Sequence, residues 1–165
     1  MNSKNKNKAL ELNPNVSVDC VIFGFDFDQL HCLLIDSGLS KSTGRPRLAV
    51  PGDLIYDIET LDEAAYRVLN ELTGIDNINL EQIGAFGDPK RMGKESDKEW
   101  LRSLRAEPDA RVITVAYFSL VKMHDFNPEA SSFAESAGWA PINEIHELAF
   151  DHYEILSEVY EKVSQ

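Results

Sequence analysis

The sequence has few cysteines, no long apolar run and a shortage of positive charge. The two cysteines, Cys20 and Cys32, lie inside apolar segments without CxxC or His-x-x-His spacing, so we expect buried thiols and no thiolate metal site. No apolar run approaches the roughly 20 residues that a membrane-spanning helix needs. Lysine and arginine number 16 against 28 acidic residues, a formal net charge of −12. Such a surface repels duplex DNA, so we expect no direct nucleic-acid binding by this chain. Because no apolar run is long enough to span a membrane, we also expect no membrane partner.

The N-terminal segment has no apolar stretch of the kind found in signal peptides. It reads MNSKNKNKALELNPN and is rich in lysine, which predicts a disordered tail over residues 1–14 and a cytoplasmic protein. The chain has 165 residues, of which 43% are hydrophobic. This length and composition are typical of one soluble globular domain, so we expect a single domain over residues 15–165.

Hydrophobic patterning predicts an α/β (α+β) chain. Runs of β-branched and aromatic residues predict strands, the first two close enough in sequence to form a hairpin. A C-terminal helix is expected within residues 146–163, with its start left open because residues 150–152 could form a loop. The order of elements favours antiparallel hairpins over a βαβ series. The predicted strands span residues 16–27, 30–36, 48–52, 78–87 and 111–123, and residues 137–145 are expected to form a short strand and a turn.

The segment ETLDEAAYRVLNELTGI, residues 59–75, carries the clearest helix signals. Thr60 and Glu63 form a T-x-x-E capping box, and Gly74 fits the C′ stop. Arg67 and Glu71 lie four residues apart and can pair. Its apolar stripe consists of Leu61, Ala64, Ala65, Val68, Leu69 and Leu72.

The polar segment at residues 90–111 concentrates positive charge. Ser96 and Glu99 predict a second capping box and a short helix. Seven of the 16 basic residues lie here, and arginine suits bidentate phosphate contacts. Acidic residues alternate with them, so a solvated mixed-charge helix is the alternative. The seven are Lys90, Arg91, Lys94, Lys98, Arg102, Arg105 and Arg111.

Residues 51–75 resemble the Nudix box, the signature of the Nudix hydrolase superfamily. The family pattern is Gly, five residues, Glu, seven residues, then Arg-Glu-aliphatic-x-Glu-Glu-x-Gly-aliphatic. The alignment has no gap, but the box is degraded: Asp53 stands at the Gly position, and Val68 and Leu72 replace two of the glutamates. The matching residues are Glu59, Arg67, Leu69, Glu71, Gly74 and Ile75.

Two further segments support the resemblance. IGAFGDPKR together with ARVITVAYFSLV resembles ADP-ribose-type Nudix proteins, and LAFDHYEILSEV resembles the end of the Nudix domain in Nudix-related transcriptional regulators. In that group a winged-helix DNA-binding domain follows, so we expect either an isolated sensor domain or a stand-alone member. The resemblance implies a Nudix fold, with a curved mixed and antiparallel sheet sandwiched between helices.

The resemblance also implies a reaction and its cofactor. Nudix enzymes split a diphosphate bond with Mg²⁺, a hard cation that wants oxygen ligands, and the family helix supplies three glutamates. Only Glu71 remains, as a residual catalytic and metal residue or as a simple ion-pair partner of Arg67. We therefore expect weak Mg²⁺ binding and impaired catalysis, unless Asp53, Asp57 or Glu59 supplies other carboxylates. Glu59, Arg67 and Gly74 are expected to be structural.

Arg91, Arg111 and Trp100 are the predicted ligand-binding residues. The two arginines flank strands that resemble the family's ligand-side segments, and Trp100 could stack on a base, anchor its helix or make a dimer contact. Phe86 is more typical of the core, and His152 of a helix start or a buried histidine.

We expect a homodimeric sensor for ADP-ribose, another nucleoside-diphosphate sugar or a related sugar metabolite, with weak or no hydrolysis. The alternatives are an Mg²⁺-dependent Nudix hydrolase of ADP-ribose type and a structural oligomerisation module. The replaced glutamates favour the sensor over the hydrolase, and the arginine-rich segment argues mildly against a purely structural module.

Overall fold

The computed structural model describes residues 11–165. Most of the predicted tail therefore lies outside the described residues, but its last part does not. Strand β1 already begins at Leu12, and the side-chain amide of Asn13 donates a hydrogen bond of 2.9 Å to Asp57 Oδ1. Residues 12–14 thus belong to the domain and not to a tail.

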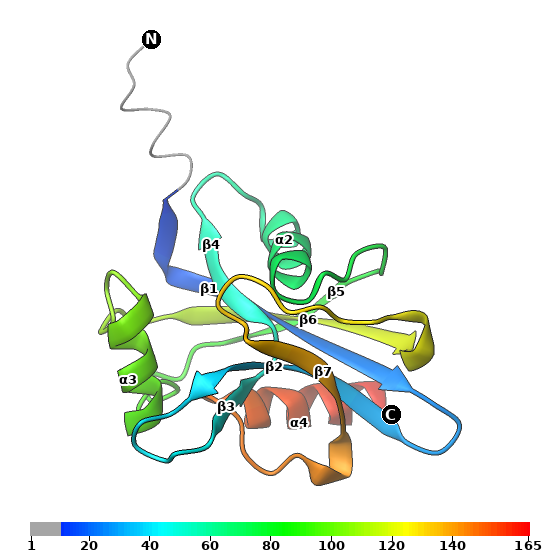
Figure 1. The fold of residues 1–165 in the computed structure, drawn as a ribbon. Helices are drawn as coiled ribbons and strands as arrows, with labels where there is room; N and C mark the ends of the chain where they lie inside the picture. Colours follow the sequence, from blue (N-terminus) through cyan, green and yellow to red (C-terminus); the bar gives the residue numbers. More distant parts are fainter. Residues whose placement is uncertain (1–10) are drawn as a thin grey trace.

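The described chain forms strands, three helices and two short 3-10 turns (Figure 1). The strands are β1 (Leu12–Phe25), β2 (Leu30–Leu39), β3 (Pro46–Ala49), β4 (Gly52–Tyr56), β5 (Glu81–Phe86), β6 (Ile113–Lys122) and β7 (Ser136–Pro141). The helices are α2 (Leu61–Thr73), α3 (Glu95–Leu104) and α4 (His152–Val163), and the turns are η1 (Met123–Asp125) and η2 (Ile142–Glu144).

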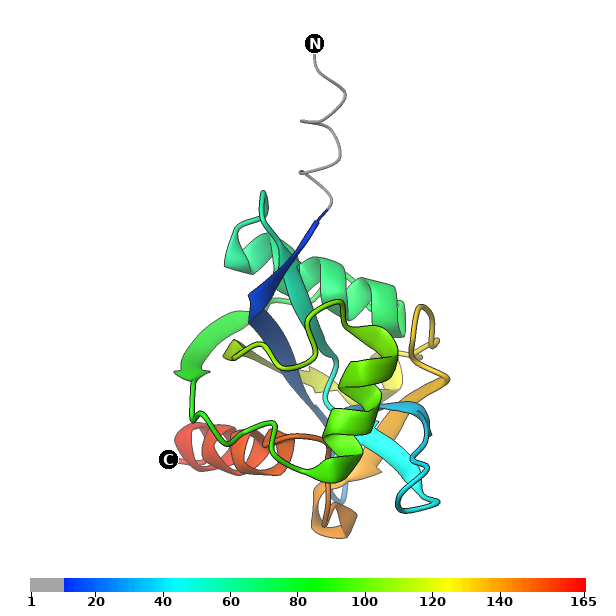
Figure 2. The ribbon, with the colours of Figure 1, turned by 90° about the vertical axis from the view of Figure 1, so that its left-hand side faces the viewer.

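The sheet is mixed and is built around β1. Its strand order is β3-β2-β1-β6-β5, with β4 also paired to β1 and β7 to β2. Strands β1 and β2 form the predicted antiparallel hairpin, whereas β1 and β6 run parallel. Helices α2 and α4 cover opposite faces of the sheet, and α3 lies at its side (Figures 1 and 2). The sandwich of a mixed sheet between helices is therefore confirmed.

Successive side chains of β1 point to opposite faces of the sheet, so they contribute to two separate core clusters. Val18, Cys20 and Ile22 belong to the cluster that includes the buried residues of α2, while Val21 and Phe23 pack with the buried face of α4. Cys20 and Cys32 are both buried and free, as predicted. Burial raises the pKa of both thiols well above the ordinary range, so neither is a reactive nucleophile.

Helix α2 has the predicted ends. Thr60 Oγ1 accepts a 3.1 Å hydrogen bond from the Glu63 amide, and Glu63 Oε1 accepts one of 3.1 Å from the Thr60 amide. Gly74 closes the helix with φ at 71°, a left-handed conformation that glycine adopts without strain. Val68 and Leu72, the positions of the missing glutamates, lie in the core with 1% exposure each.

Two sequence predictions differ from the structure, and one open boundary is now placed. The strand expected at 48–52 is two strands, because the chain leaves β2 at Val50 and pairs with β1 from Gly52, and Pro51 between them has no amide to donate. The start of the C-terminal helix, which the sequence left open, is at His152, after Phe150 with φ at 52°. The predicted capping box of Ser96 and Glu99 is wrong.

Helix α3 begins at Glu95 and has no side-chain cap at its N-cap residue, Lys94. The Glu99 carboxylate turns away from the helix end, because it accepts hydrogen bonds from Ser40 Oγ at 3.3 Å and the Ser42 amide at 3.4 Å. None of the helices in the described part of the chain is long and apolar enough to cross a membrane.

Candidate functional site

The Nudix-box residues Glu59 and Arg67 hold the loop before α2. Arg67 donates two hydrogen bonds of 2.7 Å to the Glu59 carboxylate and one of 3.1 Å to the Leu54 carbonyl. Glu59 in turn accepts the Tyr56 amide at 2.6 Å, and the guanidinium lies 4.2 Å from the centre of the Tyr56 ring. Desolvation raises the pKa of Glu59, but the hydrogen bonds and the Arg67 charge outweigh it and lower the pKa. These contacts tie α2 to the backbone of Leu54 and Tyr56 in β4.

Glu71 is tied to the same arginine. Its Oε2 lies 3.0 Å from Arg67 Nη1, and its side chain is 45% exposed. Val68 and Leu72, which replace the other two glutamates, point into the core. Among residues 11–165, no group of three or more His, Cys, Asp or Glu side chains is arranged to hold a metal ion. The donors on this helix therefore do not fit an Mg²⁺ site, which needs several oxygens in octahedral geometry.

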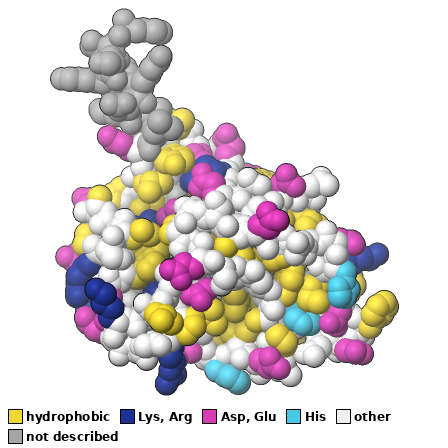
Figure 3. Space-filling model, viewed as in Figure 1, with side chains coloured by type: hydrophobic (Ala, Val, Ile, Leu, Met, Phe, Trp, Pro, Cys, Tyr) yellow, Lys and Arg dark blue, Asp and Glu magenta, His cyan; other side chains and the backbone are white. Residues whose placement is uncertain are grey.

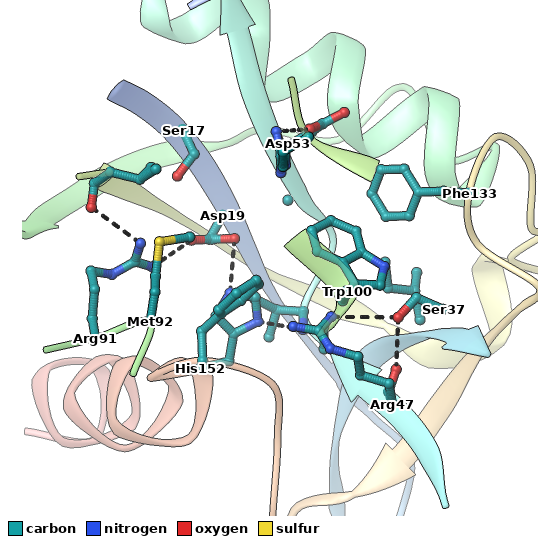
Figure 4. Close-up of a pocket in the computed structure, with 17 residues that line it drawn as sticks. Ser17, Asp19, Ser37, Arg47, Asp53, Arg91, Met92, Trp100, Phe133 and His152 are labelled. Atoms are coloured by element: carbon teal, nitrogen blue, oxygen red, sulfur yellow. Dashed lines mark hydrogen bonds and ion pairs between the residues drawn. The ribbon is translucent and has the colours of Figure 1, made fainter. Parts of the chain in front are cut away.

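A second cluster of charged side chains lines a pocket between β1, β3, β4, α3 and the start of α4 (Figure 4). We call it the central pocket. Its free space is about 30 Å³, room for one or two water molecules. Its charged and aromatic lining includes Asp19, Arg47, Asp53, Arg91, Trp100, Arg105, Phe150 and His152.

Asp19 lies at the floor of the central pocket, on β1. Thr114 Oγ1 donates to its Oδ2 at 2.6 Å, and His152 Nε2 lies 3.2 Å from its Oδ1. His152 Nδ1 accepts the Val50 amide at 3.2 Å, so the neutral ring carries its proton on Nε2 and donates it to Asp19. Burial raises the pKa of Asp19, but His152, Arg91 and Thr114 together outweigh it and lower the pKa.

Arg91 comes from the loop before α3 and donates three hydrogen bonds to other residues of the chain. It donates to both carboxylate oxygens of Asp151, at 3.1 and 2.9 Å, and to the Val112 carbonyl at 3.3 Å. Its Nη2 also lies 3.8 Å from Asp19 Oδ2. This buried network joins the α3 loop to the start of α4.

Arg47, on β3, forms the wall of the central pocket toward α3. Its Nη2 donates to Asp97 Oδ1 at 2.8 Å, and its guanidinium lies 4.6 Å from the ring centre of Trp100 and 4.5 Å from that of Phe150. Both Asp97 oxygens also accept the Phe150 amide, at 3.0 and 3.1 Å. Burial lowers the pKa of Arg47, and Asp97 opposes this shift. Arg47 Nε is buried without a hydrogen-bond partner.

Arg105, just after α3, forms the third ion pair of the pocket. Its Nη1 lies 2.9 Å from Asp53 Oδ1, and its guanidinium lies 5.2 Å from the ring centre of Trp100. Burial raises the pKa of the Asp53 carboxyl, and Arg105 and Arg67 offset only part of this effect. The pocket thus contains three guanidinium groups, each neutralised by a carboxylate of the same chain.

The structure brings together some of the predicted site residues and separates others. Arg91 and Trp100 line the central pocket. Arg111 does not: it is exposed, donates to the Gly87 carbonyl at 2.8 Å and lines a surface cavity of about 300 Å³ that Arg91 also lines. Glu71 does not line the central pocket. His152 is buried at the first position of α4, and Phe86 packs against the core, both as predicted.

Sequence reasoning missed Asp19, Arg47 and the position of Arg105 in the lining of the central pocket. Asp19 stands alone among apolar residues of a buried strand, and a charged residue in that setting is rare without a partner or a function. That signal was present in the sequence. Arg47 lies between the predicted strands 30–36 and 48–52, where a charged residue carries little information.

With this geometry in place, comparison with known proteins identifies the family. A family model described as NUDIX domain matches residues 13–162. The chain belongs to the NUDIX domain family. The resemblance found in residues 51–75 is therefore confirmed.

One relative is a transcriptional repressor described as ADPR responsive. The chain is 29% identical over 157 residues to the ADPR responsive transcriptional repressor NtrR of Acinetobacter baylyi, covering 92% of this chain and 55% of that protein. It thus spans about half the length of this relative. The NUDIX domain of Shewanella oneidensis NrtR complexed with ADP ribose aligns with a TM-score of 0.70 at 22% identity and 99% coverage of both chains. A mutT/nudix family protein from Listeria innocua aligns at 0.68 with 25% identity, covering 91% of this chain and 94% of that one.

Proposed function

We propose that this NUDIX domain binds ADP-ribose or another nucleoside-diphosphate sugar and hydrolyses it weakly or not at all. The observation that carries the proposal is the burial of Val68 and Leu72 in the core, because these positions hold glutamates in the family's catalytic helix. With apolar groups there, and with Glu71 tied to Arg67, the helix lacks the oxygen ligands for Mg²⁺. Binding of the ligand does not require them.

The central pocket supplies chemistry suited to such a ligand. Arginine binds phosphate oxygens with a planar fork of N–H donors, and Trp100 offers a flat surface for a base or a sugar. Arg47 and Arg105 both contact Trp100, so phosphate and aromatic contacts would lie side by side. The similarity to a repressor described as ADPR responsive and to a NUDIX domain complexed with ADP ribose favours ADP-ribose as the first ligand to test.

We further propose that the domain is the ligand-sensing part of a transcriptional regulator and works as a homodimer. The relative in Acinetobacter baylyi is described as a repressor. The formal net charge of −12 disfavours contact between this chain and DNA. On the face shown in Figure 3, acidic side chains are scattered widely, and several Lys and Arg side chains gather on the α3 side. The chain would therefore respond to the ligand and leave DNA contact to other regions of a regulator.

Calorimetric titration with ADP-ribose, with and without about 5 mM Mg²⁺ (roughly saturating for a weak site), tests the proposal. Chromatography of the nucleotide after titration reports hydrolysis, and AMP serves as a control ligand without the diphosphate. We expect binding that does not depend on Mg²⁺ and intact ADP-ribose at the end. AMP released only with Mg²⁺, and lost in Glu71→Gln, would instead identify a hydrolase. Absence of binding would refute the proposed ligand.

A further inference from the structure

A surface cavity of about 440 Å³ lies between β3, the start of α3 and the segment that leads into α4. We call it the outer cavity. Its free volume falls within the roughly 300–1,000 Å³ of pockets that hold small molecules. Asp53, Arg91, Trp100 and Arg105 of the central pocket do not line it, whereas Arg47 lines both spaces. The outer cavity is therefore a second place at which this chain can receive a ligand.

The start of α3 forms one wall of the outer cavity, through Lys94, Ser96 and Asp97. Figure 2 shows this end of the helix beside the orange segment that leads into α4. Lys94, the N-cap residue, makes no side-chain cap, and the Lys98 amide is the first to bond back, to the Lys94 carbonyl at 3.1 Å. The amides of residues 95–97 thus have no acceptor within the helix. Free N–H groups and the helix dipole favour an anion at such a position.

Arg47 provides a second and independent observation at the same place. Its side chain is only 7% exposed, and its Nε is buried with no hydrogen-bond partner among the described residues. Its Nη2 donates to Asp97 at 2.8 Å, and the Nε–H of a guanidinium lies on the same edge as Nη2. The spare donor therefore points toward the first turn of α3. Because an unpaired buried donor is costly, an acceptor oxygen between Arg47 and this turn would be favoured.

Three further basic side chains line the outer cavity. Lys94 Nζ donates to the Leu148 carbonyl at 3.0 Å, which holds the ammonium group beside the start of α3 and leaves two of its three N–H donors for a ligand. Arg45 and His146 also line the cavity, and both are exposed. The donors of the helix end are therefore accompanied by side chains that bind phosphate oxygens elsewhere in proteins.

The carboxylates in the lining do not cancel these donors. The Asp97 oxygens accept from Arg47 and from the Phe150 amide, so this carboxylate is already neutralised. Glu144 and Glu147 are exposed, and water and salt screen exposed charges. The acidic groups without a buried partner thus lie at the solvent side of the cavity.

We infer that the outer cavity binds a small phosphate monoester, with the phosphate oxygens between the free amides of α3, Lys94 and Arg47. A phosphate monoester carries a charge of about −1.5 to −2 and three acceptor oxygens, which match a set of N–H donors from three sources. The apolar side chains of Leu34, Leu48 and Ile145 also line the cavity and suit the carbon skeleton of the ligand. This site goes beyond the proposed function and does not depend on it.

Amide NMR spectra of the ¹⁵N-labelled chain test the inference. Inorganic phosphate and then glycerol 3-phosphate are titrated at constant pH and ionic strength, with glycerol as the control. We expect saturable downfield shifts of the amide protons of residues 95–97 with both phosphates, tighter binding of the monoester and no shift with glycerol. Absence of saturable shifts at residues 95–97, or binding of inorganic phosphate without binding of glycerol 3-phosphate, would overturn the inference. These titrations contain no ADP-ribose, so either result leaves the proposed function standing.

Two substitutions with the same change of charge separate a built site from general attraction. Lys94→Gln removes a charged donor from the outer cavity, so we expect affinity for glycerol 3-phosphate to fall about tenfold. Lys98→Gln makes the same change on the same helix outside the cavity lining and should leave the affinity unchanged. Both lysines are exposed, so both variants should fold. Equal weakening in the two would assign the binding to net charge and overturn the inference.

Ser96→Asp tests the part of the helix end directly. Its carboxylate would lie in the first turn of α3, where an acidic side chain stabilises a helix and competes for the free amides. We expect a folded protein that no longer binds glycerol 3-phosphate. Wild-type affinity in this variant would contradict a phosphate position at the start of α3.

Discussion

Asp19 and Gly52 lie side by side on β1 and β4, so close that a Cβ atom at Gly52 would be 1.9 Å from Asp19 Oδ1 and 2.8 Å from the Val18 carbonyl oxygen. The carboxylate reaches His152 and Thr114 only because residue 52 has no side chain. Gly52, within the segment that resembles the Nudix box, thus leaves the space that the Asp19 carboxylate occupies at the floor of the central pocket.

The substitution Gly52→Ala should destabilise the protein. The added methyl group must push Asp19 out of its hydrogen bonds or separate β4 from β1, which costs about 2 kcal/mol or more, as overpacking does elsewhere. Urea denaturation measures the change in the free energy of unfolding. Gly138→Ala is the matched control, since no atom lies within 4 Å of its Cβ position. Equal stability of the two variants would contradict the crowding.

Asp19 should make stability depend on pH in the acidic range. Its pKa is lowered in the folded protein, so its stabilising effect is complete above the unfolded-state pKa of about 3.9 and is lost as the pH falls through the folded-state value. Thermal unfolding from about pH 2 to pH 6 should show this loss in the wild type. Asp19→Asn should be less stable at pH 6 and show a shallower dependence, while exposed Asp76→Asn should behave as the wild type. A wild-type slope in Asp19→Asn would assign the effect to other carboxylates.

Restoring the box glutamates should not restore an enzyme. Val68→Glu and Leu72→Glu each place a carboxylate at a position with 1% exposure, and an unpaired buried charge costs several kcal/mol. We expect a lower midpoint of urea unfolding for each variant and no Mg²⁺-dependent release of AMP from ADP-ribose. Asn70→Glu, on the exposed face of the same helix, should retain wild-type stability. A folded double variant that releases AMP would show that the helix can turn these positions toward the ligand.

Arg67 and Glu71 should differ in their importance for stability. Arg67→Lys loses the double hydrogen bond to Glu59 and the contact with the Leu54 carbonyl, so we expect a loss of about 2 kcal/mol. Glu71→Gln removes a half-exposed ion pair and should change stability by less than about 1 kcal/mol. Denaturant titration of the two variants compares them directly. A larger loss in Glu71→Gln would indicate a structural task for this carboxylate beyond its pair with Arg67.

Local patterns in the sequence were enough to predict the frame of the fold but not the central pocket. The ends of α2 followed from Thr60, Glu63 and Gly74, because capping depends on neighbours within a few positions. The pocket depends on pairs that are distant in the sequence, such as Arg47 with Asp97, 50 positions apart, and Arg91 with Asp151, 60 positions apart. No periodicity links such residues.

The failure of the second predicted capping box has the same origin. Ser96 and Glu99 have the right spacing, but Glu99 finds donors in the loop of Ser40 and Ser42. A contact across the fold replaced the local one, as happens whenever tertiary partners offer better hydrogen bonds than the helix end. Spacing alone therefore indicated a helix at the correct place with the wrong start.

Strand β1 pairs with β2, β4 and β6, and its two faces contribute to both core clusters. Neither half of the domain can therefore lose its structure while the other keeps an intact strand. Melting should consequently be one all-or-none event, with the calorimetric enthalpy equal to the van't Hoff enthalpy.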